Sequence, residues 1–396
     1  MTQTPLHDAL LGQADANARP VRIAEYRGAT TAANFGDARA EFSALREGCG
    51  VYDLGFRAKI SLTGDDRVRW LNGMVTNNIR DLATGQGVYA FLLNPQGRIL
   101  GDLYAYNRGE SLLLDTDRSQ VEKMLATFEH YIIMDDVEVA EVSEKLTALG
   151  VAGPRARAAL QTAGIEIPEL APLQSIAPRC NCECECVECT VVRGEEVQHE
   201  PSQGQSEGQS SQGQPHENQS YEIWLAPKDV KQTWRALLAA GATAVGSEAL
   251  EMQRVVAGIP LYGVDIRERD LPQETEQTRA LNFTKGCYVG QEIVERIRSR
   301  GNVHRKFTGF IAENGAQIAP GMKIAAAEKE VGEITSATSV ILAGAERTVA
   351  LGYIRREVGV PGKEVAIGEA KAVVVQLPVG ESALQRQSSF AVHREG

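Results

Sequence analysis

The chain has 396 residues, of which 43% are hydrophobic, and its formal net charge is -11. This length allows a substantial buried core and suffices for two or three domains. The acidic balance argues against a broad nucleic-acid or membrane footprint, and no apolar run approaches the roughly 18 residues that a membrane span needs. Because the first residues also lack a basic start followed by an apolar stretch, we expect a cytoplasmic protein without a membrane partner.

Residues 1–48 are predicted to form an N-terminal helical segment. The apolar residues between Leu6 and Ala14 have the spacing of one amphipathic helix. A second helix is expected after Asp37, where apolar residues again recur at helical intervals. This segment precedes the first predicted domain.

Residues 49–145 are predicted to form that first domain, because short strands replace the helical pattern from Gly50 onward. A helix is expected after Gly64-Asp65-Asp66, with aspartate at its N-cap. The tetrapeptide Asn94-Pro95-Gln96-Gly97 has the residue types of a tight turn and predicts a hairpin. Strands are expected at residues 50–54, 58–62, 89–94 and 99–106.

Residues 146–250 are predicted to form a second, α+β domain. A strand, a Gly153-Pro154 turn and a helix follow one another, with the proline in the first helical turn, where its missing N–H is harmless. An alternating strand at 221–225 and an amphipathic helix at 228–240 come later. Helices that alternate with strands in this way indicate a ferredoxin-like layer.

Five of the seven cysteines lie between Cys180 and Cys189. From Cys180 to Cys186 they alternate with Asn or Glu, so an extended chain would place four thiols on one face. Soft thiolates could bind zinc, copper(I) or an iron-sulfur cluster, but thiols on one face of a flat strand cannot surround one ion. We favour a strand with inward cysteines and assign no metal ligand. The polar residues 195–220 are expected to be a disordered insert.

Residues 251–306 carry the most unusual stretch of the chain. A helix is expected to end at Gly258, and further on residues 285–292 run K-G-C-Y-V-G-Q-E. This octapeptide combines a cation, a thiol, an aromatic ring, an amide and an acid around Gly286 and Gly290. Glycine permits backbone conformations that a side chain would forbid, so we expect a specialised loop there.

The periodic run from Gln291 to Arg300 predicts a helix that begins directly after this loop. Cys287 would then lie near a helix N-terminus. The helix dipole and the nearby Lys285 would favour its thiolate over its thiol. The alternative is a small buried cysteine in a tight turn.

After the octapeptide the sequence is basic and then rich in short strands. We expect the basic patch to be a solvated face without direct RNA binding, because no aromatic residues for base stacking are interleaved. Short apolar runs separated by glycines predict a small antiparallel β-barrel at 307–378, and residues 379–396 a flexible tail. The basic patch consists of Arg296, Arg298, Arg300, His304, Arg305 and Lys306.

The octapeptide resembles the signature of the YgfZ family of folate-binding proteins, which are relatives of the glycine-cleavage T-protein, an aminomethyltransferase. The blocks G-V-Y-D-L, T-N-N-I and L-N-P-Q-G-R-I-L-G-D-L resemble the N-terminal region of both groups. The blocks G-E-I-T-S and A-L-G-Y-I-R resemble the C-terminal barrel of T-proteins. The resemblance implies an α+β, multi-domain T-protein-like fold, with residues 49–145 as the folate-binding domain, ferredoxin-like layers and a small C-terminal antiparallel β-barrel.

The same resemblance implies a function. It indicates a tetrahydrofolate-binding accessory protein that supports iron-sulfur cluster assembly or repair and, through it, tRNA modification. Its partners would be folate and iron-sulfur proteins or their assembly machinery. The alternative is a folate-dependent aminomethyltransferase or a related one-carbon transferase. T-proteins usually have two adjacent acids where this chain has Gly101-Asp102, and this difference argues against transfer.

Site residues follow from the matching blocks. Cys287 and Lys285 are the catalytic candidates. The carboxylate of Asp102 could accept hydrogen bonds from pterin N–H groups or act as a base, and its alternative is an exposed strand-end acid. The guanidinium of Arg254 could pair with the folate glutamate tail, and its alternative is an ion pair on a helix face. The candidates for folate binding are Asp102, Arg254, Tyr288, Gln291, Glu292 and Asn77.

Overall fold

The computed structural model describes residues 2–7, 21–178, 187–195, 219–301, 303–312, 315–342 and 344–379. Several predicted features therefore lie outside the described residues. They are most of the first predicted helix, four cysteines of the Cys-rich strand, nearly all of the polar insert and nearly all of the tail. Cys189 is described, and it begins strand β12 (Cys189–Arg193).

The N-terminal part contains strands as well as a helix. Strands β1 (Thr2–Gln3), β3 (Ala29–Asn34) and β2 (Arg22–Tyr26) form a three-stranded sheet. Helix α2 (Ala38–Glu47) follows, and the Asp37 side chain caps it by accepting hydrogen bonds from the next turn. The prediction of a helical segment for residues 1–48 is correct for α2 and misses β2 and β3. The small side chains of A-T-T-A-A-N in β3 give little apolar contrast.

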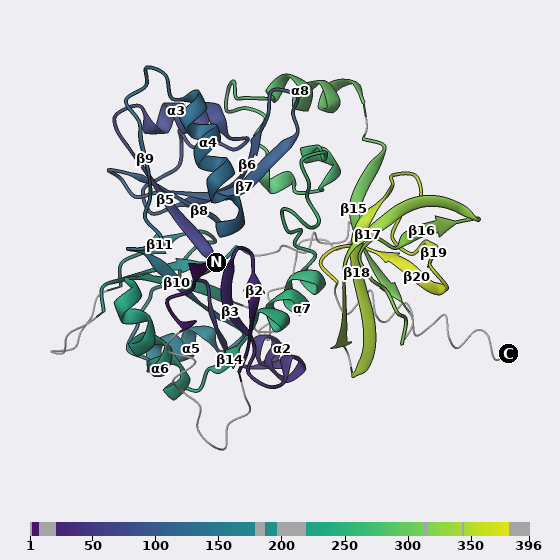
Figure 1. The fold of residues 1–396 in the computed structure, drawn as a ribbon, viewed down its shortest axis with the longest axis horizontal. Coiled ribbons are helices and arrows are strands. Elements are labelled where there is room, and N and C mark those ends of the chain that lie inside the picture. Colours follow the sequence, from purple (N-terminus) through teal and green to yellow (C-terminus); the bar gives the residue numbers. More distant parts are fainter. Residues whose placement is uncertain are drawn as a thin grey trace, which may run out of the picture.

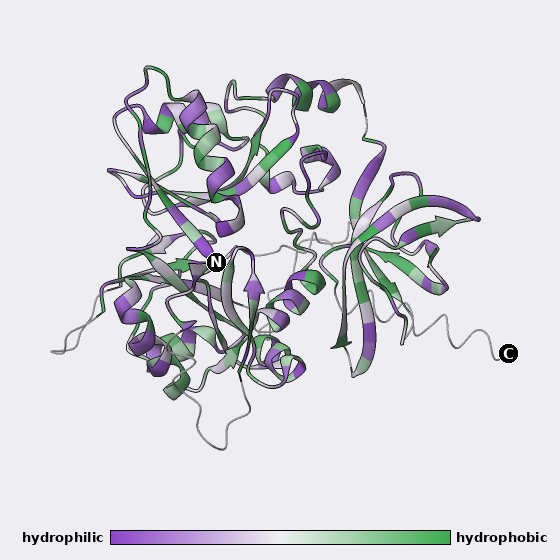
Figure 2. Cartoon of the chain, viewed as in Figure 1, coloured by the Kyte–Doolittle hydropathy of each residue, from purple (hydrophilic) through white to green (hydrophobic). Residues whose placement is uncertain are grey.

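A five-stranded sheet forms one layer of the molecule, and its strand β7 carries Asp102 (Figure 1). Its order is β6-β7-β8-β5-β9, and helices α3 and α4 cover it. Both helices carry hydrophobic and hydrophilic residues in Figure 2, as expected for helices that pack one face on a sheet. The elements are β5 (Arg57–Thr63), α3 (Arg67–Met74), β6 (Gly87–Leu93), β7 (Ile99–Asn107), β8 (Leu112–Asp117), the 3-10 turn η1 (Arg118–Gln120), α4 (Val121–Tyr131) and β9 (Glu138–Glu141).

A six-stranded sheet forms the second layer, in the order β11-β12-β13-β10-β4-β14. Strand β4 (Gly50–Asp53) pairs with β10 (Thr147–Ala152) of this sheet. The prediction from sequence places the residues of β4 in the first domain, 49–145. Helices α5 and α6 pack against the sheet through a core that includes Trp234. The remaining elements are α5 (Ala156–Thr162), β11 (Ser175–Ile176), β13 (Ser220–Leu225), the 3-10 turn η2 (Pro227–Asp229), α6 (Val230–Ala239) and β14 (Thr243–Val245).

The C-terminal strands close into an antiparallel barrel, which confirms the prediction (Figure 1). Helix α7 (Ser247–Ala257) lies between the barrel and the N-terminal strands, and its Val255 and Val256 share a core cluster with Phe307 of β15. The barrel thereby has a fixed contact with the rest of the chain. Its strands are β15 (Arg305–Ala312), β16 (Lys323–Ala326), β17 (Lys329–Leu342), β18 (Ala345–Arg355), β19 (Glu364–Ile367) and β20 (Ala370–Val375).

The segment between α7 and the barrel returns to the five-stranded sheet. It contains the 3-10 turns η3 (Pro272–Glu274) and η4 (Thr278–Ala280), and then α8 (Gln291–Arg300), which confirms the predicted helix. The predicted hairpin at residues 94–97 joins β6 to β7, and its Gly97 approaches α8 so closely that a Cβ would stand 2.8 Å from Cβ of Ile293. In the described part of the chain, no helix is both long and apolar enough to cross a membrane.

Candidate functional site

Asp102 lies on β7, where neighbouring side chains enclose its carboxylate. Its Oδ2 accepts a hydrogen bond of 2.7 Å from the Tyr89 hydroxyl, and its Oδ1 accepts one of 2.8 Å from Nε2 of Gln120. Gln120 also accepts a bond from the Asp102 backbone N–H, at 3.0 Å. Burial raises the pKa of Asp102, and the negative charge of Asp117 raises it further. Asp102 is therefore a half-buried acid with two side-chain hydrogen-bond donors, and the alternative of an exposed strand-end acid does not fit this geometry.

An aromatic wall borders this carboxylate. The rings of Tyr89 and Tyr104 lie 5.0 Å apart, and the guanidinium of Arg279 stands 4.3 Å from the centre of the Tyr89 ring. Arg279 also pairs with Glu195, which itself accepts a hydrogen bond from the Tyr104 hydroxyl at 3.2 Å. Tyr89 is buried, whereas Tyr104 and Arg279 are partly exposed; tyrosine rings and guanidinium groups can stack on planar rings. The sequence did not single out Arg279 or Glu195, because neither lies in a motif.

Asn77 is a buried residue that holds the backbone of Tyr89 and Arg279 in place. Its Nδ2 donates to the backbone carbonyl of Tyr89 at 2.8 Å and to that of Arg279 at 2.7 Å. The side chain is buried, and its Oδ1 accepts the N–H of Asn78. These bonds tie β6 to η4, so the structure favours a supporting role for Asn77 over direct contact with a ligand.

Lys285 is buried and its ammonium is directed into α3. Nζ donates to the carbonyl of Asn72 and, at 2.6 Å, to that of Val75, and it lies 4.8 Å from the centre of the Tyr288 ring. Burial lowers the pKa of Lys285 to about 7, while the two carbonyl acceptors oppose this by stabilising the charged form. The same loop donates the N–H of Val289 to the Gly73 carbonyl. Lys285 thus holds the octapeptide loop against the end of α3.

Cys287 is exposed, unlike the buried cysteine of the alternative interpretation. Gln291 opens α8 and Glu292 is an exposed acid in its first turn. Tyr288 is buried in an apolar cluster that also contains Tyr89, so the octapeptide loop and the Asp102 region meet through that cluster. The structure therefore brings Tyr288 close to the aromatic wall and leaves Cys287 at the surface.

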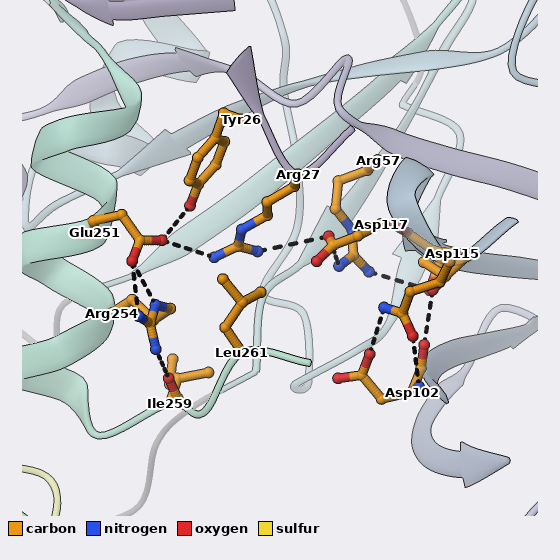
Figure 3. Close-up of polar contacts among 12 residues, drawn as sticks. Tyr26, Arg27, Arg57, Asp102, Asp115, Asp117, Glu251, Arg254, Ile259 and Leu261 are labelled. Carbon is orange, nitrogen blue, oxygen red and sulfur yellow. Dashed lines mark hydrogen bonds and ion pairs between the residues drawn. The ribbon is translucent and has the colours of Figure 1, made fainter. Parts of the chain in front are cut away.

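Arg254, on α7, is buried and surrounded by acceptors (Figure 3). It donates to Asp265 at 2.5 Å, to Glu251 at 2.7 and 3.0 Å, and to Ser336 at 2.9 Å. It also donates to the carbonyl of Ile259 at 2.8 Å. With its donors engaged in this way, the structure favours the ion-pair alternative over binding of a ligand carboxylate.

A chain of ion pairs extends from this arginine towards Asp102 (Figure 3). Arg27, at the tip of the β2–β3 hairpin, lies between Glu251 at 3.4 Å and Asp117 at 3.6 Å. Arg57 donates to Asp117 at 2.8 Å and to Asp115 at 2.7 Å. Sequence reasoning missed this network because its members come from four separate elements.

The hairpin reaches the network because of its turn. Gly28 has a φ of 90°, and a Cβ there would stand 2.6 Å from the Ser119 nitrogen. The N–H of Ser119 donates to the Arg27 carbonyl at 3.2 Å. A residue with a side chain would hold the tip away from η1, so the Arg27-Gly28 pair is the local signal that could have located Arg27.

Comparisons with known proteins give matches along most of the chain. Residues 5–171 match the model of the GCVT N-terminal domain. An aminomethyltransferase of Rubrobacter xylanophilus is 28% identical over 381 residues, which cover 96% of this chain and 94% of that protein. An aminomethyltransferase of a Picosynechococcus species is 24% identical over 372 residues, which cover 93% of each chain.

One solved structure has the same architecture. The crystal structure of the glycine cleavage system aminomethyltransferase T from Bartonella henselae matches with a TM-score of 0.80 and 21% identity, covering 96% of this chain and 98% of that chain. In the described residues, no cluster of His, Cys, Asp or Glu could hold a metal ion. The assignment to the YgfZ family stays a prediction. The chain has the T-protein fold, and its residues 5–171 are similar to the GCVT N-terminal domain.

Proposed function

We propose that this protein binds tetrahydrofolate, or a derivative of it, and transfers a one-carbon group as an aminomethyltransferase-like enzyme. The observation that carries the proposal is the half-buried carboxylate of Asp102 beside the aromatic wall of Tyr89 and Tyr104. The named relatives support transfer over the accessory role that the octapeptide suggested. Both are aminomethyltransferases, and both match this chain over nearly its whole length.

The chemistry of a pterin suits these groups. The ring carries N–H donors on one edge, and the carboxyl group of Asp102 can accept hydrogen bonds from such donors. Its flat faces can stack on tyrosine, and Arg279 adds a planar cation to the same wall. Asp102 can in addition exchange a proton with a ring or side-chain nitrogen of the folate.

A second candidate is the accessory role in iron-sulfur assembly. The exposed thiol of Cys287, on a loop that Lys285 holds in place, is the observation that favours it. An exposed cysteine can react with partners, whereas a buried one cannot. In cells that lack the protein, Cys287→Ser should then fail to restore iron-sulfur enzyme activity, while Cys49→Ser, a change at a buried thiol, should restore it.

One experiment separates the two candidates. Purified protein is incubated with tetrahydrofolate and an aminomethyl donor, and the folate products are followed by mass spectrometry. Transfer predicts catalytic formation of a one-carbon-loaded folate, which Asp102→Asn abolishes and Asp81→Asn, a change at an exposed acid of the same domain, does not. Binding without turnover would favour the accessory role, and the absence of binding would contradict both.

A further inference from the structure

Two acidic residues, Asp102 of β7 and Asp117 of β8, lie on the same face of neighbouring strands, and the charge of Asp117 acts on Asp102. Strands β7 and β8 pair in antiparallel fashion with Tyr104 opposite Asp115, so the next residues on the same face are Asp102 and Asp117. The hydroxyl of Thr116 donates to the Asp102 carbonyl at 2.8 Å, which fixes the two strand ends beside each other. The carboxylates therefore interact although fifteen positions separate them in the sequence.

Their surroundings differ in charge. Asp117 is buried and accepts from Arg57 at 2.8 Å, with the guanidinium of Arg27 at 3.6 Å on its other side (Figure 3). Among the described residues, the Asp102 carboxyl group accepts from the neutral Tyr89 hydroxyl and the neutral amide of Gln120. Two neighbouring acids do not both ionise readily, and the acid that accepts no hydrogen bond from a cation holds its proton more strongly.

We propose that Asp117 is a positioning residue of this site, which acts by keeping a proton on its cross-strand neighbour Asp102. This inference rests on the proposed folate site and assigns Asp102 the role of proton donor there. The O–H bond of Asp102 breaks and an N–H bond forms on a nitrogen of the bound ligand, which gains the positive charge. The carboxylate that remains is stabilised by the same Tyr89 hydroxyl and Gln120 amide. The reverse proton transfer reforms the O–H bond of Asp102.

Other charged and titratable groups also face Asp102. Burial and the charge of Asp117 raise the pKa of Asp102, while the hydrogen bonds from Tyr89 and Gln120 and the charge of Arg57 lower it. Removal of the Asp117 charge should therefore lower the pKa of Asp102, whereas removal of the Tyr89 or Gln120 hydrogen bond should raise it. The groups around Asp102 are Tyr89 of β6, Tyr104 of β7, Asp117 of β8, Arg57 of β5, Gln120 of η1 and Tyr262 of the segment after α7.

The test is a pH titration of the Asp102 carboxyl carbon by NMR, in the full chain labelled at aspartate and without ligand. The resonance is assigned by its loss in Asp102→Asn. Asp117→Asn should lower the titration midpoint of Asp102 by about one pH unit, because one adjacent negative charge is removed. Tyr89→Phe should raise it, because a donor to the carboxylate is lost.

Glu251→Gln is the matched control. It removes one negative charge from the same chain of ion pairs, next to Arg27 and away from Asp102, so the midpoint should stay within about 0.3 pH units of the unchanged protein. An unchanged midpoint in Asp117→Asn, or equal shifts in Asp117→Asn and Glu251→Gln, overturns the inference.

Calorimetric titration of tetrahydrofolate at several pH values then addresses the ligand. The pH at which affinity changes should move with the Asp102 midpoint in each variant. Absence of folate binding together with a shifted midpoint would contradict the proposed function and leave the carboxylate pair intact. Folate binding whose pH dependence is identical in Asp117→Asn would overturn the inference and leave the proposed function intact.

Discussion

The glycine before α8 is where one added methyl group should most disturb the octapeptide loop. Gly290 has a φ of 81°, and a Cβ there would stand 2.6 Å from the Asn94 carbonyl oxygen and 3.1 Å from Cβ of Leu93. The left-handed conformation costs another residue about 1–2 kcal/mol, and forcing an atom into a packed contact costs about 1–3 kcal/mol. Gly290→Ala should therefore lower the free energy of unfolding by about 2–5 kcal/mol.

Two other glycines of the same region separate these effects. Gly286 has a φ of 96° with no described atom within 4 Å of an added Cβ, so Gly286→Ala should cost only the backbone contribution of about 1–2 kcal/mol. Gly301, at the other end of α8, has a φ of -162° and the same open space. Gly301→Ala should change stability by less than about 0.5 kcal/mol.

The assay is denaturant unfolding of the full chain, followed by tryptophan fluorescence and circular dichroism. The expected order of destabilisation is Gly290→Ala, then Gly286→Ala, then Gly301→Ala. If Gly290→Ala costs no more than Gly286→Ala, the close approach between α8 and the hairpin is refuted as a source of stability.

Three further predictions concern the cations and thiols. Lys285→Met should destabilise the protein. Because burial lowers the pKa of Lys285 from 10.5 to about 7, the unfolded state binds more protons between these pH values, and the difference in unfolding free energy between the unchanged protein and the variant should increase as the pH rises from 7 to 10.5. A difference that does not depend on pH would refute the effect of burial. Arg254→Met should lower the free energy of unfolding by about 3–5 kcal/mol, because Asp265 loses its buried cation. In calorimetry, Arg254→Met should lose equal affinity for tetrahydrofolate and for an analogue without glutamate. A larger loss for tetrahydrofolate would indicate that Arg254 binds the glutamate tail directly. Iodoacetamide should label the exposed Cys287 before the buried Cys49, whose pKa burial raises to about 11, as followed by peptide mass spectrometry; equal rates would contradict these exposures.

Local patterns predicted the elements that local forces determine. The helix after Gly290, the hairpin at residues 94–97 and the barrel strands all follow from glycine positions and apolar spacing, and the structure contains them. Strands β2 and β3 were missed because small residues carry little of that signal. Their stability comes from pairing and from contacts with α7, which no local window contains.

The site was only partly predictable for a related reason. Asp102 lies in a recognisable block, but its neighbours Asp117 and Gln120 are brought to it by strand pairing and by η1. The sequence has no second acid next to Asp102, whereas the fold supplies Asp117 from the adjacent strand. Arg254 could be recognised as a cation, but two of its acceptors, Asp265 and Ser336, come from the loop after α7 and from the barrel.

The central claim is that a pterin binds beside Asp102, and a crystal structure with bound tetrahydrofolate tests it most directly. The account predicts density for the ring against Tyr89 and Tyr104, with a ring nitrogen about 3 Å from the Asp102 carboxylate. Density for the ring elsewhere, with Asp102 still bonded only to Tyr89 and Gln120, would contradict it.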